Sequence, residues 1–182
     1  MELAKRILNI IDTNIILCLI PMILCLLLVH LFFKNRFQTK KALNVISWII
    51  LIYTIVMIIY SIIGIIFYYN EFAFINRATG PYKLFFWFMF LSANVFPFTL
   101  FIKKFRTKFL YVLAVAFFMK IGAYFERFVI ITTSLHRDYA EGHEFSDLFF
   151  LLSILMLQGF LLAIILLGIL EIVERKNHKK LN

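Results

Sequence analysis

The sequence predicts an all-α integral membrane protein, a bundle of about five transmembrane helices. Of the 182 residues, 63% are hydrophobic, whereas soluble domains contain about half apolar residues. The mean hydropathy is +0.94, and the apolar residues lie in long runs separated by short basic segments. Neither an internal repeat nor a low-complexity linker divides the chain. We therefore expect a single membrane domain over residues 1–182.

Five apolar runs are long enough to cross a hydrocarbon core, which takes about 20 helical residues. The first is too long for the apolar part of a signal peptide and no small-residue cleavage site follows it, so we expect an uncleaved span. The third contains Pro97, whose kink neighbouring helices can tolerate. The expected spans are residues 12–33, 44–69, 83–102, 109–133 and 147–171.

Basic residues gather after the first, third and fifth expected spans, in residues 34–41, 103–108 and 175–180. An odd number of crossings places these three segments on one side, and the positive-inside rule makes that side cytoplasmic. The N-terminus is thus expected outside and the C-terminus inside. The net charge of +9 is then a topology signal, and no nucleic-acid partner is expected.

The fourth expected span contains the charges Lys120, Glu126 and Arg127. A charge near the bilayer centre costs about 2.5–3.5 kcal/mol on insertion scales, so such charges face partners or aqueous cavities. Lys120, Tyr124 and Arg127 share a helix face, while Glu126 is turned about 100° away from Arg127. The surplus positive charge requires a neutral Lys120, a partner subunit, an anionic lipid or a polar cofactor head group. Lys120, Tyr124 and Glu126 are the proton-transfer candidates.

Three polar residues are expected at similar depth in the membrane: Asn94, Lys120 and Gln158. They form a candidate polar layer, for which hydrogen bonding that merely joins helices is the simpler interpretation. No metal site is expected, because Cys18 and Cys25 lack CxxC spacing and the histidines are irregularly placed. The chain is expected to bind no cofactor by itself.

Residues 69–138 resemble the membrane subunits of the NrfD/PsrC type, and most nearly the C-terminal half of the ActC subunits of alternative complex III, a quinol:cytochrome c oxidoreductase. The longest similar run extends from Ile121 through Glu126-Arg127 to Ser134-Leu135-His136-Arg137-Asp138. The other similar pieces are Arg77-Ala78-Thr79-Gly80-Pro81-Tyr82, then Trp87 with Asn94 and Pro97, then Lys104 with Arg106.

The resemblance implies a subunit that lies beside iron–sulfur and cytochrome c subunits and other membrane subunits of a quinol-oxidising respiratory complex. Glu126 and Arg127 would correspond to a glutamate–arginine pair of the family. Quinone is expected at an interface with partners, and phospholipid is expected as a further partner. The candidate residues for a quinone or lipid head group are Glu126, Arg127, His136, Arg137 and Asp138.

The chain also departs from the family pattern. It lacks a glutamate near Ser61 or Ile62 and a histidine in residues 38–41, and Lys120 replaces an expected asparagine. The leading hypothesis is a reduced NrfD/ActC-like subunit that assists quinol electron transfer or proton conduction, with redox centres on partners, rather than an enzyme by itself. The alternatives are a non-catalytic assembly subunit of such a complex and a small proton-coupled transporter.

Overall fold

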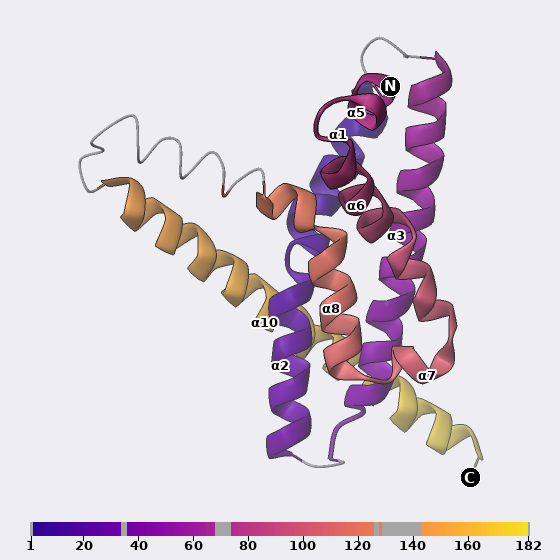
Figure 1. Ribbon diagram of the computed structural model, residues 1–182. Helices are drawn as coiled ribbons and strands as arrows, with labels where there is room; N and C mark the ends of the chain where they lie inside the picture. The colour runs from indigo at the N-terminus through magenta and orange to yellow at the C-terminus, as the bar shows by residue number, and fades with distance from the viewer. Residues whose placement is uncertain (1, 34–35, 68–73, 126–127, 129–142, 182) are drawn as a thin grey trace. The chain divides into compact units, whose positions relative to one another are not determined.

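The computed structural model describes residues 2–33, 36–67, 74–125, 128 and 143–181, and the residues so described form helices and no strand (Figure 1). The all-α prediction is confirmed for them. The helices are α1 (Glu2–Ile11), the π-helix η1 (Asp12–Ile16), α2 (Leu19–Phe32), α3 (Thr39–Phe67), α5 (Phe74–Thr79), α6 (Lys83–Asn94), the 3-10 helix η2 (Phe96–Phe101), α7 (Lys103–Arg106), α8 (Phe109–Met119) and α10 (His143–Leu181).

Four of the described helical segments are long and apolar enough to cross a membrane: Glu2–Phe32, Thr39–Phe67, Lys83–Phe101 and Leu152–Lys176. They overlap the expected first, second, third and fifth spans. The expected fourth span is helical over Phe109–Met119, which is shorter than a span, and over residues 121–125. Most of its second half lies outside the described residues. The fold is thus compatible with a multi-pass membrane protein, while a count of five spans stays a prediction.

The chain divides into two compact units. Unit 1 consists of Met1–Ile46 and Phe128–Asn182, and unit 2 consists of Ser47–Arg127. Helix α3 begins in unit 1 and continues into unit 2.

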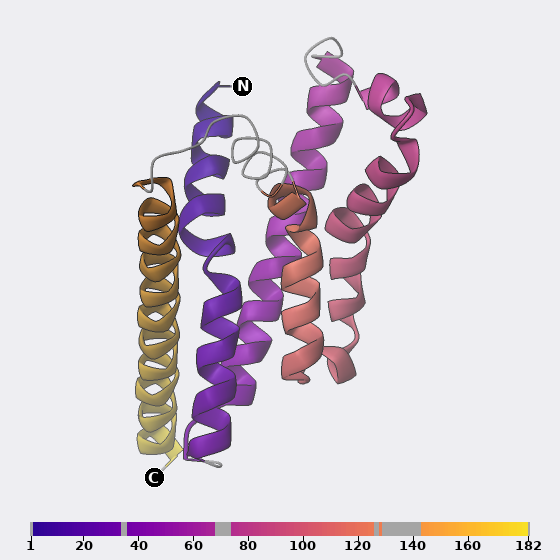
Figure 2. The same ribbon diagram turned by 60° about the vertical axis from the view of Figure 1, so that its left-hand side comes forward.

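Unit 1 is built on the packing of α10 against α2 (Figure 2). A Cβ at Gly159 of α10 would lie 2.5 Å from Cγ of Pro21 and 3.0 Å from the carbonyl oxygen of Cys18, so only glycine fits this approach. Ala163, one helical turn later, is fully buried, as is Leu19 of α2. Small residues spaced by four allow two helix backbones to approach closely.

The first membrane-length segment and α10 run in the same direction. Well inside both segments, Gln158 of α10 bonds to Asn14 of η1. Further along the chain in both, Glu174 of α10 pairs at 3.1 Å with Lys41, which follows the first segment, and Thr39 at the start of α3 bonds to His30 of α2 at 3.0 Å. Parallel helices that cross a membrane begin on the same side, as the expected topology of the first and fifth spans requires. Which side is cytoplasmic stays a prediction.

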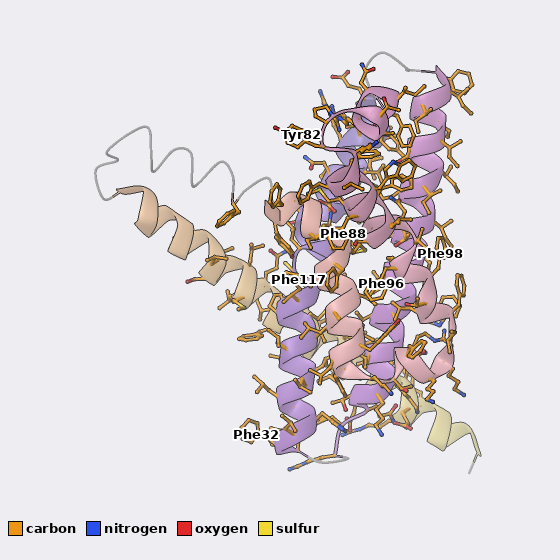
Figure 3. The ribbon with its side chains drawn as sticks, in the orientation of Figure 1. Phe32, Tyr82, Phe88, Phe96, Phe98 and Phe117 are labelled. Atoms are coloured by element: carbon orange, nitrogen blue, oxygen red, sulfur yellow. The ribbon has the colours of Figure 1, made fainter. Side chains whose placement is uncertain are left out.

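Unit 2 is held together largely by aromatic side chains of α6, η2 and α8, several of which are labelled in Figure 3. Phe118 of α8 meets the edges of Phe88 and Phe96, with ring centroids 6.4 and 5.8 Å apart. Leu100 and Val112 are fully buried, whereas Leu84 is 78% exposed. Large apolar side chains exposed in this way suit a lipid environment.

Replacement of Gly159 tests the close approach of α2 and α10. We expect Gly159→Val to lower the free energy of unfolding by about 1–3 kcal/mol, because the new side chain overpacks against Pro21. The matched control is Gly168→Val on the same helix, where an added Cβ meets nothing within 4 Å. Thermal unfolding of the purified protein in detergent measures both, and equal losses would contradict the packing.

Candidate functional site at the helix interruptions

Regular α-helix is interrupted in three of the apolar segments. The first contains the π-helix η1, the third changes from α6 to η2 after Asn94, and α8 ends before Lys120, after which residues 121–125 are helical again. An interruption of this kind frees backbone N–H or C=O groups, which in a bilayer need a partner within the protein. The polar side chains that lie at these interruptions define the candidate site in each unit.

In unit 1 the interruption is paired with α10. The N–H of Leu17 donates to the carbonyl of Asp12, at 3.0 Å, and that of Cys18 to the carbonyl of Ile15, at 3.2 Å, so the helical register is broken around Asn14. The carbonyl of Asn14 accepts a hydrogen bond from Nε2 of Gln158 at 3.0 Å. The side chain of Gln158 therefore satisfies a carbonyl that the π-helix leaves without its ordinary helical donor.

Local sequence explains why η1 forms here. Pro21 has no N–H to donate to the carbonyl four residues earlier, which weakens the helix on its N-terminal side. Thr13 and Asn14 also bond through their side chains to the carbonyls of Asn9 and Ile10, at 2.8 and 2.9 Å. Side chains that bond back to the preceding turn commonly bend helices. The polar stretch before Pro21 is thus suited to an interruption.

In unit 2 the interruption places a cation beside a phenol. Nζ of Lys120 lies 3.4 Å from the hydroxyl oxygen of Tyr53 on α3 and 5.4 Å from the centre of its ring. Tyr53 is only 8% exposed. A cation over an aromatic ring gains about 0.5–2 kcal/mol, depending on how far the pair is removed from water. Tyr53 therefore offsets part of the cost of the lysine charge.

The backbone at Lys120 shows a single irregular residue. The N–H of Lys120 donates to the carbonyl of Phe117, three residues back, at 3.1 Å, and the carbonyl of Lys120 accepts from Tyr124 at 3.0 Å. The next contact along α3 reinforces the pairing, because Oγ1 of Thr54 lies 3.9 Å from Sδ of Met119. Neighbouring positions of α3 thus contact the last residue of α8 and the residue that follows it.

The predicted polar layer consists of residues with three different partners. Gln158 pairs with Asn14, Lys120 with Tyr53, and Nδ2 of Asn94 donates to the carbonyl of Phe90 in its own helix at 3.0 Å. Tyr124, the third residue of the proton-transfer set, stacks on Phe117 with ring centroids 5.6 Å apart. The remaining candidates lie outside the described residues: Glu126, Arg127, His136, Arg137 and Asp138.

Two contributors were not singled out from the sequence, Tyr53 and Asn14. Both carry a polar group within an apolar span, which is the signal that would have identified them. Gly159 and Ala163, four residues apart, similarly mark the helix-packing face of α10. Among the described residues, no three His, Cys, Asp or Glu side chains are grouped so as to hold a metal ion.

No family model, curated protein or solved structure matches the chain. The resemblance to NrfD/PsrC-type subunits therefore rests on the quoted residues, several of which have local packing roles. Nε1 of Trp87 donates to the carbonyl of Ala78 at 3.2 Å and so joins two of the similar pieces. Gly80 is required where a Cβ would lie 2.6 Å from the carbonyl oxygen of Asn76. Gly122 lies against Met89 of α6.

Replacement of Gln158 tests the pairing across unit 1. Gln158→Leu removes the donor to the carbonyl of Asn14, and we expect it to lower the free energy of unfolding by about 1–2 kcal/mol. Chemical or thermal unfolding in detergent measures the loss.

The matched control is Asn94→Leu, which also replaces an amide by leucine but removes only a bond within one helix turn. We expect its effect to be within about 0.5 kcal/mol of zero. If Asn94→Leu is as destabilising as Gln158→Leu, the bond between α10 and η1 has no special role.

Proposed function

We propose that this chain is a reduced NrfD/ActC-like membrane subunit of a respiratory quinol-oxidising complex. It assists electron transfer from quinol, proton conduction or both, while iron–sulfur and cytochrome c subunits carry the redox centres. The chain binds no cofactor by itself, and quinone is held at an interface with its partners in a bacterial inner membrane. The observation that carries this proposal is the run from Gly122 to Asp138, with its adjacent Glu126 and Arg127.

The geometry at Lys120 supports a proton-handling role. Oxidation of a quinol to a quinone releases two electrons and two protons, so protons need acceptors near the site while the electrons pass to redox centres. The hydroxyl of Tyr53 can accept one hydrogen bond and donate another, and it lies 3.4 Å from Nζ of Lys120. Ionisable residues inside membrane spans commonly mark proton or substrate pathways. Glu126 follows Lys120 in the same run of sequence.

Interrupted helices are also typical of membrane proteins that move ions or protons. Non-helical backbone at membrane depth occurs where it is buried in protein or lines a water-filled cavity. In substrate sites of transporters, helix breaks bring backbone groups to the ligand. The breaks after Asn94 and at Lys120 fall within the part of the chain that resembles the family.

A second function, a non-catalytic assembly subunit of the same kind of complex, is favoured by a different observation. The contacts of Trp87 with Ala78, of Gly80 with Asn76 and of Gly122 with Met89 are packing contacts. Packing alone therefore accounts for some of the residues that resemble the family, without a role for them in catalysis. An assembly subunit would have the same partners. In that case, substitution of the intramembrane charges should affect assembly of the complex but not its turnover.

Substitution of Glu126 and Arg127 within the intact complex distinguishes these two functions. We expect Glu126→Gln to reduce quinol-dependent cytochrome c reduction by at least about tenfold while the complex still co-purifies, because a proton-transfer residue contributes about 10²–10⁴-fold. Arg127→Met is expected to act in the same direction. Turnover and the recovery of iron–sulfur and cytochrome c subunits are measured on one preparation.

The control is Glu174→Gln, which removes a carboxylate whose partner is Lys41 in unit 1. We expect normal turnover from it. Unchanged turnover with loss of assembly in the Glu126 and Arg127 variants would favour the assembly subunit. A stable isolated homo-oligomer without redox partners would contradict both functions.

A further inference from the structure

Four cations gather where α7 leads into α8. Lys103, Lys104, Arg106 and Lys108 lie within six residues, and the three lysines are exposed. In the part of the chain that the structure describes, none of the ion pairs joins a carboxylate to them. The backbone is extended at Ile102 and at Lys108, so this short segment forms a turn between two apolar helices. The result is a compact positive surface at the expected membrane boundary.

Arg106 is held in place but incompletely bonded. Its guanidinium carbon lies 4.8 Å from the centre of the Trp48 ring on α3, so the planar group is fixed by stacking. Its Nε is buried and has no hydrogen-bond partner among the described residues. A buried charged donor without an acceptor is unfavourable, and guanidinium groups match phosphate oxygens in geometry. Because Nε itself is buried, an anion from outside the chain would bond to the terminal nitrogens of the guanidinium and balance its charge.

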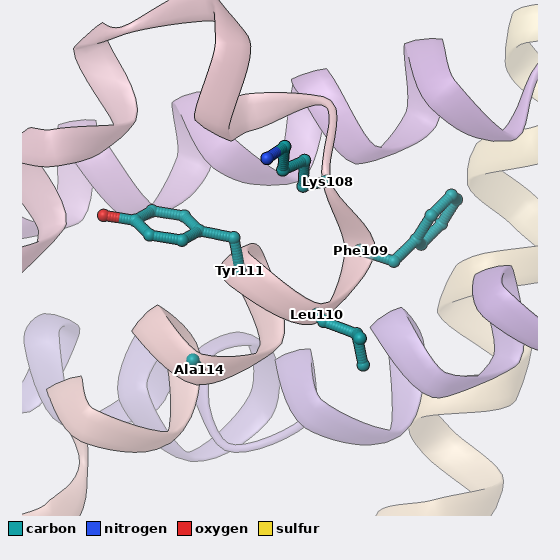
Figure 4. Close-up of a pocket in the computed structure, with 5 residues that line it drawn as sticks. All are labelled: Lys108, Phe109, Leu110, Tyr111 and Ala114. Carbon is teal, nitrogen blue, oxygen red and sulfur yellow. The ribbon is translucent and has the colours of Figure 1, made fainter.

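An apolar groove begins at Lys108, next to this positive surface (Figure 4). Its lining is mostly apolar, and Lys108 and Tyr111 extend to the same side of the chain in Figure 4. The Tyr111 ring is fixed by stacking on Phe105, with centroids 4.5 Å apart. The groove is open rather than enclosed, with a volume of about 540 Å³. The groove is lined by Lys108, Phe109, Leu110, Tyr111 and Ala114.

We propose that the α7–α8 turn binds an anionic glycerophospholipid. The phosphate lies between Arg106 and Lys108, Lys103 and Lys104 add to the positive field, and an acyl chain follows the groove past Tyr111 and Ala114. Charge complementarity and location favour this ligand, because basic clusters beside membrane spans attract anionic lipids. A free phosphate ion would leave the apolar groove unused. The site is separate from the proposed function and does not depend on it.

Trp48 provides a direct reporter, because it contacts Arg106 and the chain has one other tryptophan, Trp87. The full-length Trp87→Phe variant is purified in a neutral detergent and titrated with phosphatidylglycerol or phosphatidylcholine brominated near the head group. We expect phosphatidylglycerol to quench Trp48 at a several-fold lower concentration. Lys108→Gln should reduce this preference about five-fold, equivalent to about 1 kcal/mol. Ala114→Leu, which fills the groove, should weaken quenching by both lipids.

The matched control is Lys83→Gln, another exposed lysine, at the first residue of α6 in the same unit. Lys83→Gln should leave the preference for phosphatidylglycerol over phosphatidylcholine unchanged. Added inorganic phosphate should also leave this preference unchanged. Equal quenching by both lipids would overturn the proposal. An effect of Lys83→Gln equal to that of Lys108→Gln would also overturn it. If Trp87→Phe does not fold, native mass spectrometry of the Lys108 and Lys83 variants of the chain measures the same preference.

Discussion

The constraint on which the rest of the structure depends is that a polar group inside a bilayer must find its partner within the protein. An uninterrupted apolar helix meets this requirement with its own backbone. Here the helical segments around Asn14, Asn94 and Lys120 are interrupted, and a polar side chain lies at or beside each interruption. Gln158 serves the carbonyl of Asn14, the amide of Asn94 bonds to its own helix, and Tyr53 lies beside Lys120. The bond of Gln158 joins α10 to η1, and the contact of Lys120 with Tyr53 joins the end of α8 to α3. Gly159 allows α10 to lie close to α2.

Much of the fold was predictable from hydropathy, because lipid-facing helices must be apolar over a set length. The expected third span, 83–102, coincides closely with Lys83–Phe101, and 44–69 overlaps Thr39–Phe67. The kink at Pro97 in the third span was predicted, and the helix changes there from α6 to η2. The interruptions at η1 and Lys120 were not predicted, because a hydropathy window averages over the residues that cause them. Pro21, the residue expected to weaken the helix at η1, lies several residues beyond the end of that π-helix.

The candidate site was predictable in part. Sequence reasoning singled out Lys120 and Gln158 as polar residues between apolar neighbours, but depth alone cannot name a partner on another helix. Asn14 and Gln158 are 144 residues apart in the sequence, and only the packing of α10 brings them together. The hydroxyl of Tyr53 is a weak polar signal beside its large apolar ring, so this residue was not singled out. The positive charges of unit 2 thus differ in their surroundings. Lys120 is paired with Tyr53 within the unit, whereas the basic residues of the α7–α8 turn are suited to an anionic ligand.

A double-mutant cycle between Lys120 and Tyr53 tests most directly whether an intramembrane charge is compensated within the chain. The free energy of unfolding in detergent is measured for Lys120→Met, Tyr53→Leu and both together. A compensated lysine predicts that the two substitutions are not additive, with a coupling energy of about 1 kcal/mol. Additivity within about 0.3 kcal/mol would contradict the account, because Lys120 would then derive its stabilisation from other groups.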